Sequence, residues 1–373
     1  MMKEVSYVVV FPTIFSKNKI PQLISNIKKI LKIRNQEFIS VNRDKDIILV
    51  KSGDPVFASS AINLLFGVEK VAIARQVKNE FKTIVSEITS IGGNLLLKGE
   101  KFLVKVEGTS KGFLPKDVEI AATSNIIEKK SKLGAYPGTE ENYDKLLYTY
   151  LTKNNAYICI FIDNGLGGIP YISPNQNTIC CIFDELSAVS CFETIKQGYD
   201  TKIIICYNKK SDLLNIVKTI NKIIPRLIKE KISLDFFQVK INPTGAKNYL
   251  SFVNTILEIM LYEAKKRKIN FISVPISPLI FSQNIFKIFM EKIIQNKKSP
   301  IFPLSGVDKT IFDSAKEIGM EQRMKKMNEI IGLKFSEISQ ISKINLKTAL
   351  KTKKTVEVII GPNNVHDILD SLE

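Results

Sequence analysis

The sequence is poor in the residues that build metal and redox sites. It contains one histidine, His366, and none of its five cysteines stands in a C-x-x-C pair. Because zinc sites need several His or Cys ligands at short spacings, we predict no metal site. All the cysteines fall in apolar stretches, so we interpret them as reduced core residues of a cytoplasmic protein: Cys159, Cys180, Cys181, Cys191 and Cys206.

Long apolar runs are lacking as well. The N-terminal stretch VSYVVVFPTIF is too short to cross a bilayer, and no small-residue cleavage site comes after it. We therefore predict that this stretch is a β-strand and that the protein has no membrane partner.

Positive charge is in excess. Fifty-four lysines and arginines stand against thirty-seven acidic residues, which gives a formal net charge of +17 over 373 residues. Such a chain favours a polyanionic partner, most simply nucleic acid. The excess is mostly lysine in an Ile-, Lys- and Asn-rich sequence, which the base composition of a genome can also produce. Charge alone leaves both interpretations open.

The length favours two or three domains. Up to about residue 75, the hydrophobic pattern predicts a β-α-β-β-α-β unit. It has a helix over 19–33 and a second helix at the start of SSAINLLFGVEKVAIA (59–74), which turns at Gly67 into a strand. The segments expected next are a helix over 79–94, a strand over 101–108, a helix over 117–130 and strands over 145–151 and 156–163, before a loop GLGGIP.

After residue 175 the pattern of apolar residues changes. The strand-like runs TICCIF, KIIICY, SLDFFQVKI and INFISV alternate with helical stretches. This alternation predicts a parallel sheet with helices on both faces. The tail contains a lysine-rich stretch, LKTALKTKK, which we predict to be a linker. A strand TVEVII, a GPNN turn and a helix HDILDSL come after it, and they can pack on the α/β domain or on a partner.

Three stretches in this order resemble segments of the 4-thiouridine synthetase (ThiI) family: LLFGVEKVAIA, NGLGGIPYISPNQNTICCIF and SPIFPLSGVDKTIFDSAKEIGM. The resemblance implies an α/β multidomain protein. Its expected parts are an N-terminal ferredoxin-like domain (1–75), a THUMP domain that binds tRNA (76–172), a Rossmann-like parallel α/β domain of the PP-loop ATP pyrophosphatase type (173–330) and a C-terminal tail (331–373).

In the family, the THUMP domain binds the acceptor end of tRNA. Lysines concentrated in and after one strand and helix of this segment could hold an RNA backbone, because contacts with phosphates need cations and depend little on the base sequence. For any single one of them, ordinary surface charge is the simpler explanation. The candidate RNA-binding set is Lys105, Lys111, Lys116, Lys129, Lys130 and Lys132.

The loop GLGGIP has a structural explanation. Gly165, Gly167 and Gly168 allow positive φ in a tight interdomain turn, and Pro170 stiffens the residues after it. The loop stands before the first strand of the α/β domain and not between that strand and its helix, so we do not assign it to phosphate binding.

The family's phosphate loop, Ser-Gly-Gly-x-Asp-Ser, comes directly after that strand. An ungapped match places its six positions on Ile182, Phe183, Asp184, Glu185, Leu186 and Ser187, and only the last serine agrees. Asp184 and Glu185 put negative charge where phosphate would lie, and like charges repel. Acidic residues are favoured in the first turn of a helix. We therefore predict that Asp184 is a helix cap and that this nucleotide loop is degenerate.

Later family segments are also altered. Where the family has Thr-Gly-Glu-Ser, the sequence has Ser273 to Ile276, and Phe302 replaces an arginine. Asp308 and Lys309 are expected to begin a helix that ends near Gly319. The family positions that are kept are Ser282, Gln283, Pro303, Leu304, Asp308 and Lys309.

Sulfur transfer requires a thiolate. No cysteine occurs after Cys206, so the family's catalytic cysteine has no counterpart. Cys191 and Cys206 could substitute in principle, but their apolar neighbours indicate packed side chains. We assign no catalytic residue.

The sequence supports three hypotheses. The leading one is a tRNA-binding, ThiI-like THUMP protein with an inactive PP-loop domain, which acts in tRNA modification as a binding or accessory subunit without a cofactor. Its further partners would be an active modification enzyme or a second copy of itself. The second is a divergent ATP-dependent tRNA 4-thiouridine synthetase (tRNA sulfurtransferase) that uses ATP and Mg. The third is a partner-binding scaffold with no RNA role.

Overall fold

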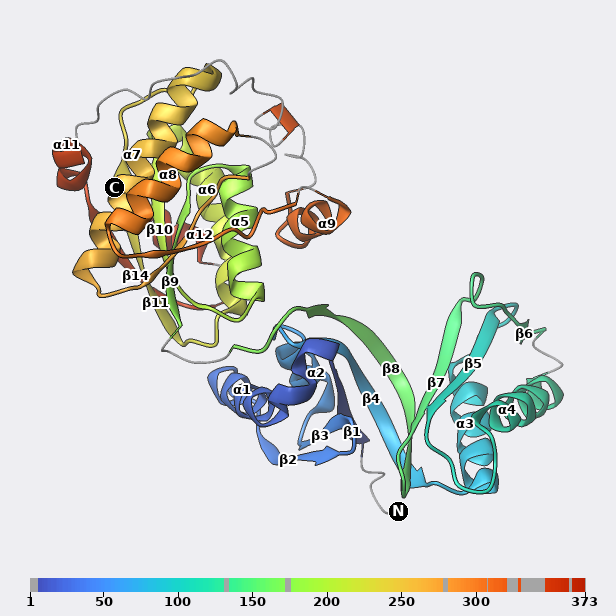
Figure 1. Cartoon of the computed structure of the whole chain (residues 1–373). Coiled ribbons are helices and arrows are strands. Elements are labelled where there is room, and N and C mark those ends of the chain that lie inside the picture. Colours follow the sequence, from blue (N-terminus) through green and yellow to red (C-terminus); the bar gives the residue numbers. More distant parts are fainter. Residues whose placement is uncertain are drawn as a thin grey trace. The chain divides into compact units, whose positions relative to one another are not determined.

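The computed structural model describes residues 6–130, 134–171, 176–277, 281–306, 308–320, 328–329, 346–361 and 364–372, with the side chain of Lys130 excepted. The chain divides into two compact units, Met1–Gly168 and Ile169–Glu373. Both are α/β, as the sequence predicts (Figure 1). None of the described helices is both long enough and apolar enough to cross a membrane.

Unit 1 is built on one sheet with the strand order β2-β3-β1-β4-β8-β7-β5-β6. Its first elements have the predicted β-α-β-β-α-β order: β1 (Ser6–Pro12), η1 (Ile14–Lys19), α1 (Ile20–Ile33), β2 (Phe38–Asp44), β3 (Ile47–Ser52), α2 (Pro55–Ile62) and β4 (Val68–Lys78). The remaining elements are α3 (Phe81–Leu95), β5 (Lys101–Gly108), α4 (Pro115–Lys130), β6 (Tyr136–Pro137), β7 (Lys145–Leu151) and β8 (Asn155–Gly167).

The first two α-helices of unit 1 begin for different local reasons. α1 carries a proline in its first turn and buries an apolar stripe that includes Leu23 and Ile27, as its periodicity predicts. α2 begins earlier than predicted. Asp54 caps it by accepting hydrogen bonds from the backbone N–H groups of Val56 and Phe57, and Pro55 occupies the first position.

The two longest strands of unit 1, β4 and β8, pair antiparallel along almost their whole length. The predicted boundary between residues 75 and 76 lies within β4. The first half of GLGGIP lies at the end of β8, where Gly167 is in register with Val68. Gly167 and Gly168 have the expected positive φ, but Gly165 does not. It is required instead because an added Cβ would lie 2.3 Å from the carbonyl oxygen of Val68.

Unit 2 contains a second sheet with the strand order β13-β12-β9-β10-β11-β14. Its elements are β9 (Asn177–Ile182), α5 (Glu185–Lys196), β10 (Asp200–Tyr207), α6 (Lys210–Ile223), η3 (Ile224–Arg226), β11 (Lys231–Gln238), α7 (Gly245–Lys266), β12 (Phe271–Ser273), α8 (Gln283–Gln295), β13 (Ser299–Ile301), α9 (Lys309–Glu317), α11 (Leu346–Lys351), β14 (Lys354–Ile359) and α12 (Val365–Asp370).

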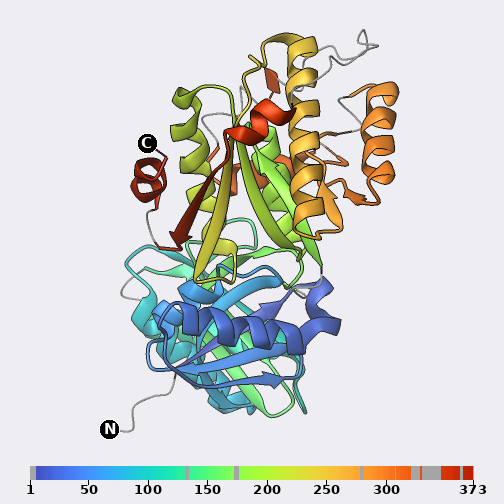
Figure 2. The ribbon, with the colours of Figure 1, turned by 90° about the vertical axis from the view of Figure 1, so that its left-hand side faces the viewer.

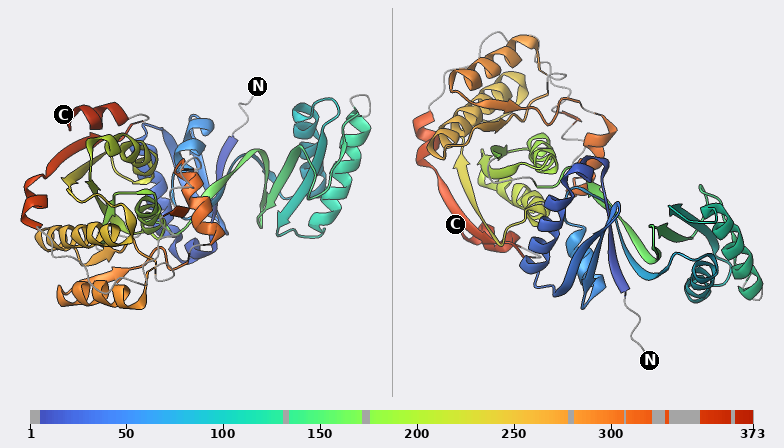
Figure 3. Two further views of the ribbon diagram at one scale, coloured as in Figure 1. Left: turned by 90° about the horizontal axis from the view of Figure 1, so that it is seen from above. Right: turned by 60° about the horizontal axis from the view of Figure 1, so that its bottom comes forward.

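The strands from β9 to β13 are parallel, as the alternating pattern predicts. Helices α5 and α6 cover one face of this sheet, and α7 and α8 cover the other (Figure 3). β10 and β11 add to one side of β9, and the chain then crosses back to add β12 and β13 on the other side. β9 therefore lies inside the sheet, where the order of the strands reverses. In open α/β sheets, ligands bind beside the carboxyl ends of the strands at such a reversal.

The C-terminal segment packs on unit 2. LKTALKTKK, predicted to be a linker, forms α11 and the start of β14. β14 adds to the sheet edge beside β11 in the antiparallel direction (Figure 2). α12 lies against α6. The predicted strand and final helix therefore exist, and both contribute to the fold of this unit.

Candidate functional site

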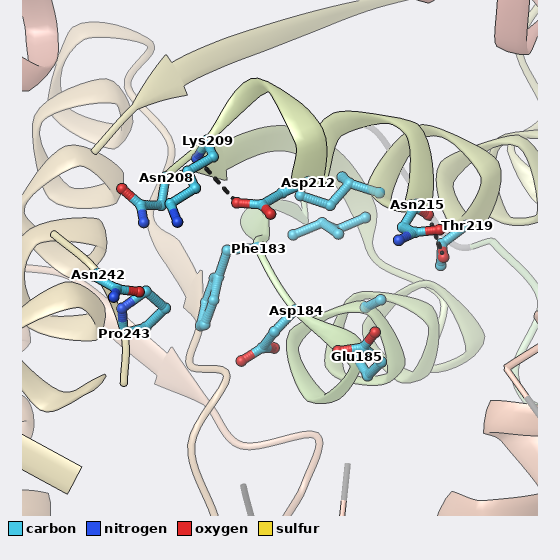
Figure 4. A pocket seen from close by; sticks show the side chains of 13 residues that line it. Phe183, Asp184, Glu185, Asn208, Lys209, Asp212, Asn215, Thr219, Asn242 and Pro243 are labelled. Carbon is cyan, nitrogen blue, oxygen red and sulfur yellow. Dashed lines mark hydrogen bonds between the residues drawn. The ribbon is translucent and has the colours of Figure 1, made fainter. Parts of the chain in front are cut away.

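A cavity of about 290 Å³ lies at the carboxyl edge of the unit 2 sheet, between the first turn of α5 and the first three turns of α6 (Figure 4). We call it the carboxyl-edge pocket. The residues that line it come after β9, β10 and β11, and they include Phe183, Asp184, Glu185, Lys209, Asp212 and Asn242. This is the position at which parallel α/β domains hold their ligands.

The turn between β9 and α5 carries the predicted helix cap. Asp184 is the N-cap residue, and its Oδ1 accepts a hydrogen bond of 2.8 Å from the backbone N–H of Ser187. In return, Oγ of Ser187 accepts hydrogen bonds of 2.9 Å from the backbone N–H groups of Phe183 and Asp184. The turn therefore uses three of its own backbone donors internally, whereas a phosphate loop directs such donors at its ligand.

The carboxyl group of Asp184 is held from two sides. The hydroxyl of Tyr249 on α7 donates a hydrogen bond of 2.7 Å to Oδ2. The pKa of Asp184 is raised to about 6, mainly by burial and to a smaller extent by the neighbouring Glu185. The hydrogen bonds from Ser187 and Tyr249 act in the opposite direction and lower the pKa. At neutral pH the carboxyl group is thus mostly ionised, and an approaching phosphate would meet an anion.

The remaining polar groups of the pocket do not compensate for this charge. Glu185 and Asp212 add two carboxylates, and Lys209 is the cation among the lining residues. Oδ2 of Asp212 accepts a hydrogen bond of 3.0 Å from the backbone N–H of Lys209 (Figure 4). Carboxylates and asparagine amides suit a ligand rich in hydrogen-bond donors. A triphosphate, in contrast, is usually bound by cations and free N–H groups.

The altered family segments have structural roles in unit 2. Oγ of Ser273 shares a hydrogen bond of 2.7 Å with Oγ1 of Thr194, and the next residues through Ile276 are buried. Phe302, at the arginine position, packs its ring against that of Phe286 with centroids 4.9 Å apart. None of these side chains offers a charge to a nucleotide.

The family positions that are kept lie at helix starts or in the core. Ser282 precedes α8, and Gln283 is its first residue. Pro303 and Leu304 are buried. Asp308 caps α9 by accepting hydrogen bonds from the backbone N–H groups of its first turn, and Lys309 begins that helix, as predicted.

No cysteine and no histidine is among the described residues that line the carboxyl-edge pocket. All five cysteines are buried, and burial raises the pKa of Cys191 well above its ordinary value. Cys206 lies inside β10. His366 is exposed on α12. Among the described residues, no three His, Cys, Asp or Glu side chains converge as metal ligands.

The lysines predicted to bind RNA differ in their surroundings. In unit 1, Lys105 lies on β5 and pairs with Glu107 at 3.6 Å and Glu140 at 3.4 Å. Lys116 pairs with Glu119 at 2.8 Å. The other described members, Lys111 and Lys129, are exposed, Lys130 ends α4, and Lys132 lies outside the described residues.

The sequence did not indicate the pocket residues that lie far from the β9–α5 turn along the chain. Tyr249 lies in an apolar helix, where its hydroxyl gave no signal in the sequence. Asn242 and Pro243 come after β11 and reach the pocket only because parallel strands end at the same edge. The position of the strand ends could have indicated Asn242, but nothing in the sequence indicated Tyr249.

No family model matches the chain. A curated protein of Methanosarcina acetivorans, named probable tRNA sulfurtransferase, is 23% identical over 188 residues, which are 50% of this chain and 45% of that protein. The match therefore spans about half the length of this relative.

Two solved structures share the fold. The structure of PH1313 from Pyrococcus horikoshii Ot3 has a TM-score of 0.59 at 17% identity and covers 88% of this chain and 100% of its own. A 4-thiouridine synthetase–RNA complex with bound ATP has a TM-score of 0.64 at 13% identity and covers 95% of this chain and 100% of its own. Together with the curated relative, these structures confirm that the chain resembles the 4-thiouridine synthetase (ThiI) family.

Proposed function

We propose that this chain is a tRNA-binding, ThiI-like protein that acts in tRNA modification as a binding or accessory subunit. The relative named as a tRNA sulfurtransferase and the synthetase–RNA complex support the place in tRNA modification. The net charge of +17 supports a polyanionic partner. The family's ATP and Mg have no role in this proposal.

One observation carries the accessory role. The backbone N–H groups of Phe183, Asp184 and Ser187 are already hydrogen-bonded within the β9–α5 turn. A phosphate could take them only by breaking the cap, and each broken hydrogen bond costs about 0.5–1.5 kcal/mol before the repulsion from Asp184 is counted. The turn is therefore stable as a helix start and poor as a phosphate site.

A second candidate is an active ATP-dependent tRNA sulfurtransferase. The observation that favours it is the carboxyl-edge pocket, which remains open at about 290 Å³ where α/β domains bind ligands. The ATP-bound synthetase also matches along its whole length. In this case the cap would have to open when ATP binds.

The deciding experiment measures two ligands on the full-length protein. A labelled tRNA transcript is titrated at two salt concentrations, and labelled ATP is titrated with Mg²⁺, with and without tRNA. The accessory role predicts salt-sensitive tRNA binding and no ATP binding under either condition. Micromolar ATP binding would replace the first candidate by the second, and weak, salt-insensitive RNA binding would favour the scaffold without an RNA role.

Two controls make the result specific. An unrelated RNA hairpin of the same length as the tRNA tests whether binding depends on more than charge. The variant Glu185→Gln removes one carboxylate beside the turn and leaves the three occupied N–H groups unchanged. If ATP binds to this variant and not to the wild type, charge alone blocks the site, and the occupied donors are not the reason.

A further inference from the structure

A second cavity, of about 320 Å³, lies where the parallel strands of unit 2 begin, at the end of the sheet opposite to the carboxyl-edge pocket. We call it the amino-edge pocket. It is lined by the first residues of three parallel strands, among them Thr178 on β9, Lys202 on β10 and Lys231 on β11. Parallel strands begin at one edge and end at the other, so this cavity is separate from the carboxyl-edge pocket.

The lining of the amino-edge pocket is strongly basic. Of the described residues that form it, four are cations and one is an acid: Lys202, Lys229, Lys231, Arg267 and Asp200. The carboxylate of Asp200 is bound to Lys229, with Nζ 2.6 Å from Oδ1. The other three cations therefore face the cavity without an acid of its own lining to balance them.

Beneath the pocket, two buried acids contact two of these lining cations and a third cation, Lys353. Asp235 is fully buried and contacts Lys202 at 3.2 Å, Arg267 at 2.6 Å and Lys353 at 3.3 Å. Glu263, 1% exposed, contacts Arg267 at 3.2 Å and Lys353 at 2.9 Å. Two carboxylates thus form ion pairs with three cations. Burial lowers the pKa of Lys202 despite its contact with Asp235, and the nearby Arg267 and Lys353 lower it further.

Two donors are available to a ligand. Nε and Nη2 of Arg267 are fixed by Glu263 and Asp235, and Nη1 makes no hydrogen bond within the described part of the chain. Lys231 is exposed at the start of β11, and its ammonium group forms no ion pair with any described residue. An oriented guanidinium and a free ammonium that line one cavity are groups suited to recognise phosphate oxygens.

We propose that the amino-edge pocket binds a phosphate group, through Arg267 and Lys231 with Lys202 behind them. The phosphate can belong to an RNA backbone or to a small phosphorylated compound, since both present the same oxygens. The RNA source rests on the proposed function, whereas the small-compound source does not.

Pyrophosphate is the first probe. It is titrated calorimetrically at low salt into the full-length wild type and into Lys231→Gln, Arg267→Gln and Lys247→Gln. Lys247 is an exposed lysine in the first turn of α7, at the other edge of the sheet, so its variant is the matched control for loss of one charge. We expect Lys231→Gln to weaken binding about tenfold, the loss of one charge-assisted hydrogen bond, and Lys247→Gln to leave it unchanged.

Arg267→Gln should weaken binding at least as much, but it also disturbs the contacts with Asp235 and Glu263. Lys231→Gln therefore carries the test, since its side chain has no structural partner to lose among the described residues. Equal pyrophosphate affinity in the wild type and Lys231→Gln, together with unchanged tRNA binding, would overturn the proposal.

The same variants distinguish the two sources. If an RNA phosphate occupies the pocket, Lys231→Gln should reduce the slope of log K for tRNA against log salt by about 0.7–0.9, the share of one phosphate contact. If a small compound occupies it, tRNA binding should be the same in all variants while pyrophosphate affinity falls. Failure of the wild type to bind tRNA would contradict the proposed function and leave the pyrophosphate result standing.

Discussion

The hydroxyl of Tyr249 on α7 lies 2.7 Å from Oδ2 of Asp184, the residue that caps α5. The two helices cover opposite faces of the sheet, so this hydrogen bond crosses its carboxyl edge beside the end of β9. It joins the two faces at the turn between β9 and α5, to which the ungapped match assigns the phosphate loop of the 4-thiouridine synthetase family. A ligand that displaced the cap would therefore also break a link between α5 and α7.

The raised pKa of Asp184 predicts a pH-dependent stability. The ordinary pKa is 3.8 and the folded value is about 6, so between these pH values the folded chain holds a proton that the unfolded chain has lost. The stability contributed by this group is fully present below pH 3.8 and is lost as the pH rises through 6. Asp184→Asn, which still caps a helix, should gain roughly 1–3 kcal/mol relative to the wild type between pH 4 and pH 7.

Urea denaturation of both proteins at several pH values measures this difference. Tyr249→Phe is the matched control, because it removes a hydrogen bond that lowers the pKa of Asp184 and should move the transition to higher pH. A constant difference between wild type and Asp184→Asn across this range would show that the carboxylate is not desolvated.

The buried ion network around Asp235 predicts a large loss of stability on substitution. Its pKa lies below the ordinary value, because the hydrogen bond from Thr355 and the charges of Lys202, Lys353 and Arg267 outweigh the effect of burial. Asp235→Asn should cost about 3–5 kcal/mol in the free energy of unfolding of unit 2, since it leaves three cations partly unpaired. Hydrogen exchange of the β11 amides measures this loss.

Asp313→Asn is the control for the network. Asp313 is 53% exposed and lies 3.9 Å from Lys316 on α9. Its loss should change stability by less than about 0.5 kcal/mol. Similar effects of the two substitutions would contradict the role assigned to the buried network.

The burial of every cysteine predicts slow thiol chemistry in the folded protein. A small aromatic disulfide reagent should label fewer than one thiol rapidly under native conditions and all five after denaturation in urea. Rapid labelling of Cys191 in the native protein would reopen its role in sulfur transfer. Mass spectrometry of the labelled peptides identifies which cysteine reacts.

Close backbone approach predicts a steric effect at Gly165. An added Cβ would lie 2.3 Å from the carbonyl oxygen of Val68, so Gly165→Ala must separate β8 from β4 locally. We expect a loss of about 1–3 kcal/mol in the stability of unit 1. Gly53→Ala is the matched control, because a Cβ at Gly53 meets no atom within 4 Å. Thermal unfolding of both variants should show a lower midpoint for Gly165→Ala alone.

The α/β class and the cap at Asp184 could be predicted because each is local. The spacing of apolar residues specifies the strands and helices, and an acidic residue between a strand and a helix specifies the cap. The start of α2 was missed because its signal is the pair Asp54–Pro55, upstream of the apolar pattern. LKTALKTKK was predicted to be a linker because charged residues dominate it. Its short helix buries only Ala349, which is too little to give a hydrophobic pattern.

Long-range contacts could not be predicted. The bond from Tyr249 to Asp184 joins residues 65 positions apart, and the amino-edge pocket collects lysines from the starts of separate strands. In the sequence, none of these lysines differs from the many others of this lysine-rich chain. Their common position depends on the strand order, which the hydrophobic pattern does not contain.

The pairing of β4 with β8 has a consequence for how the chain is made. β4 ends at Lys78 and β8 begins at Asn155, so the ribosome must add nearly eighty residues before the open edge of β4 meets its partner. During that interval the nascent β1–β4 layer presents an unpaired strand, which is the kind of surface that chaperones cover and that aggregates recruit. A pause in translation between these two strands would therefore extend the period in which the new protein is vulnerable.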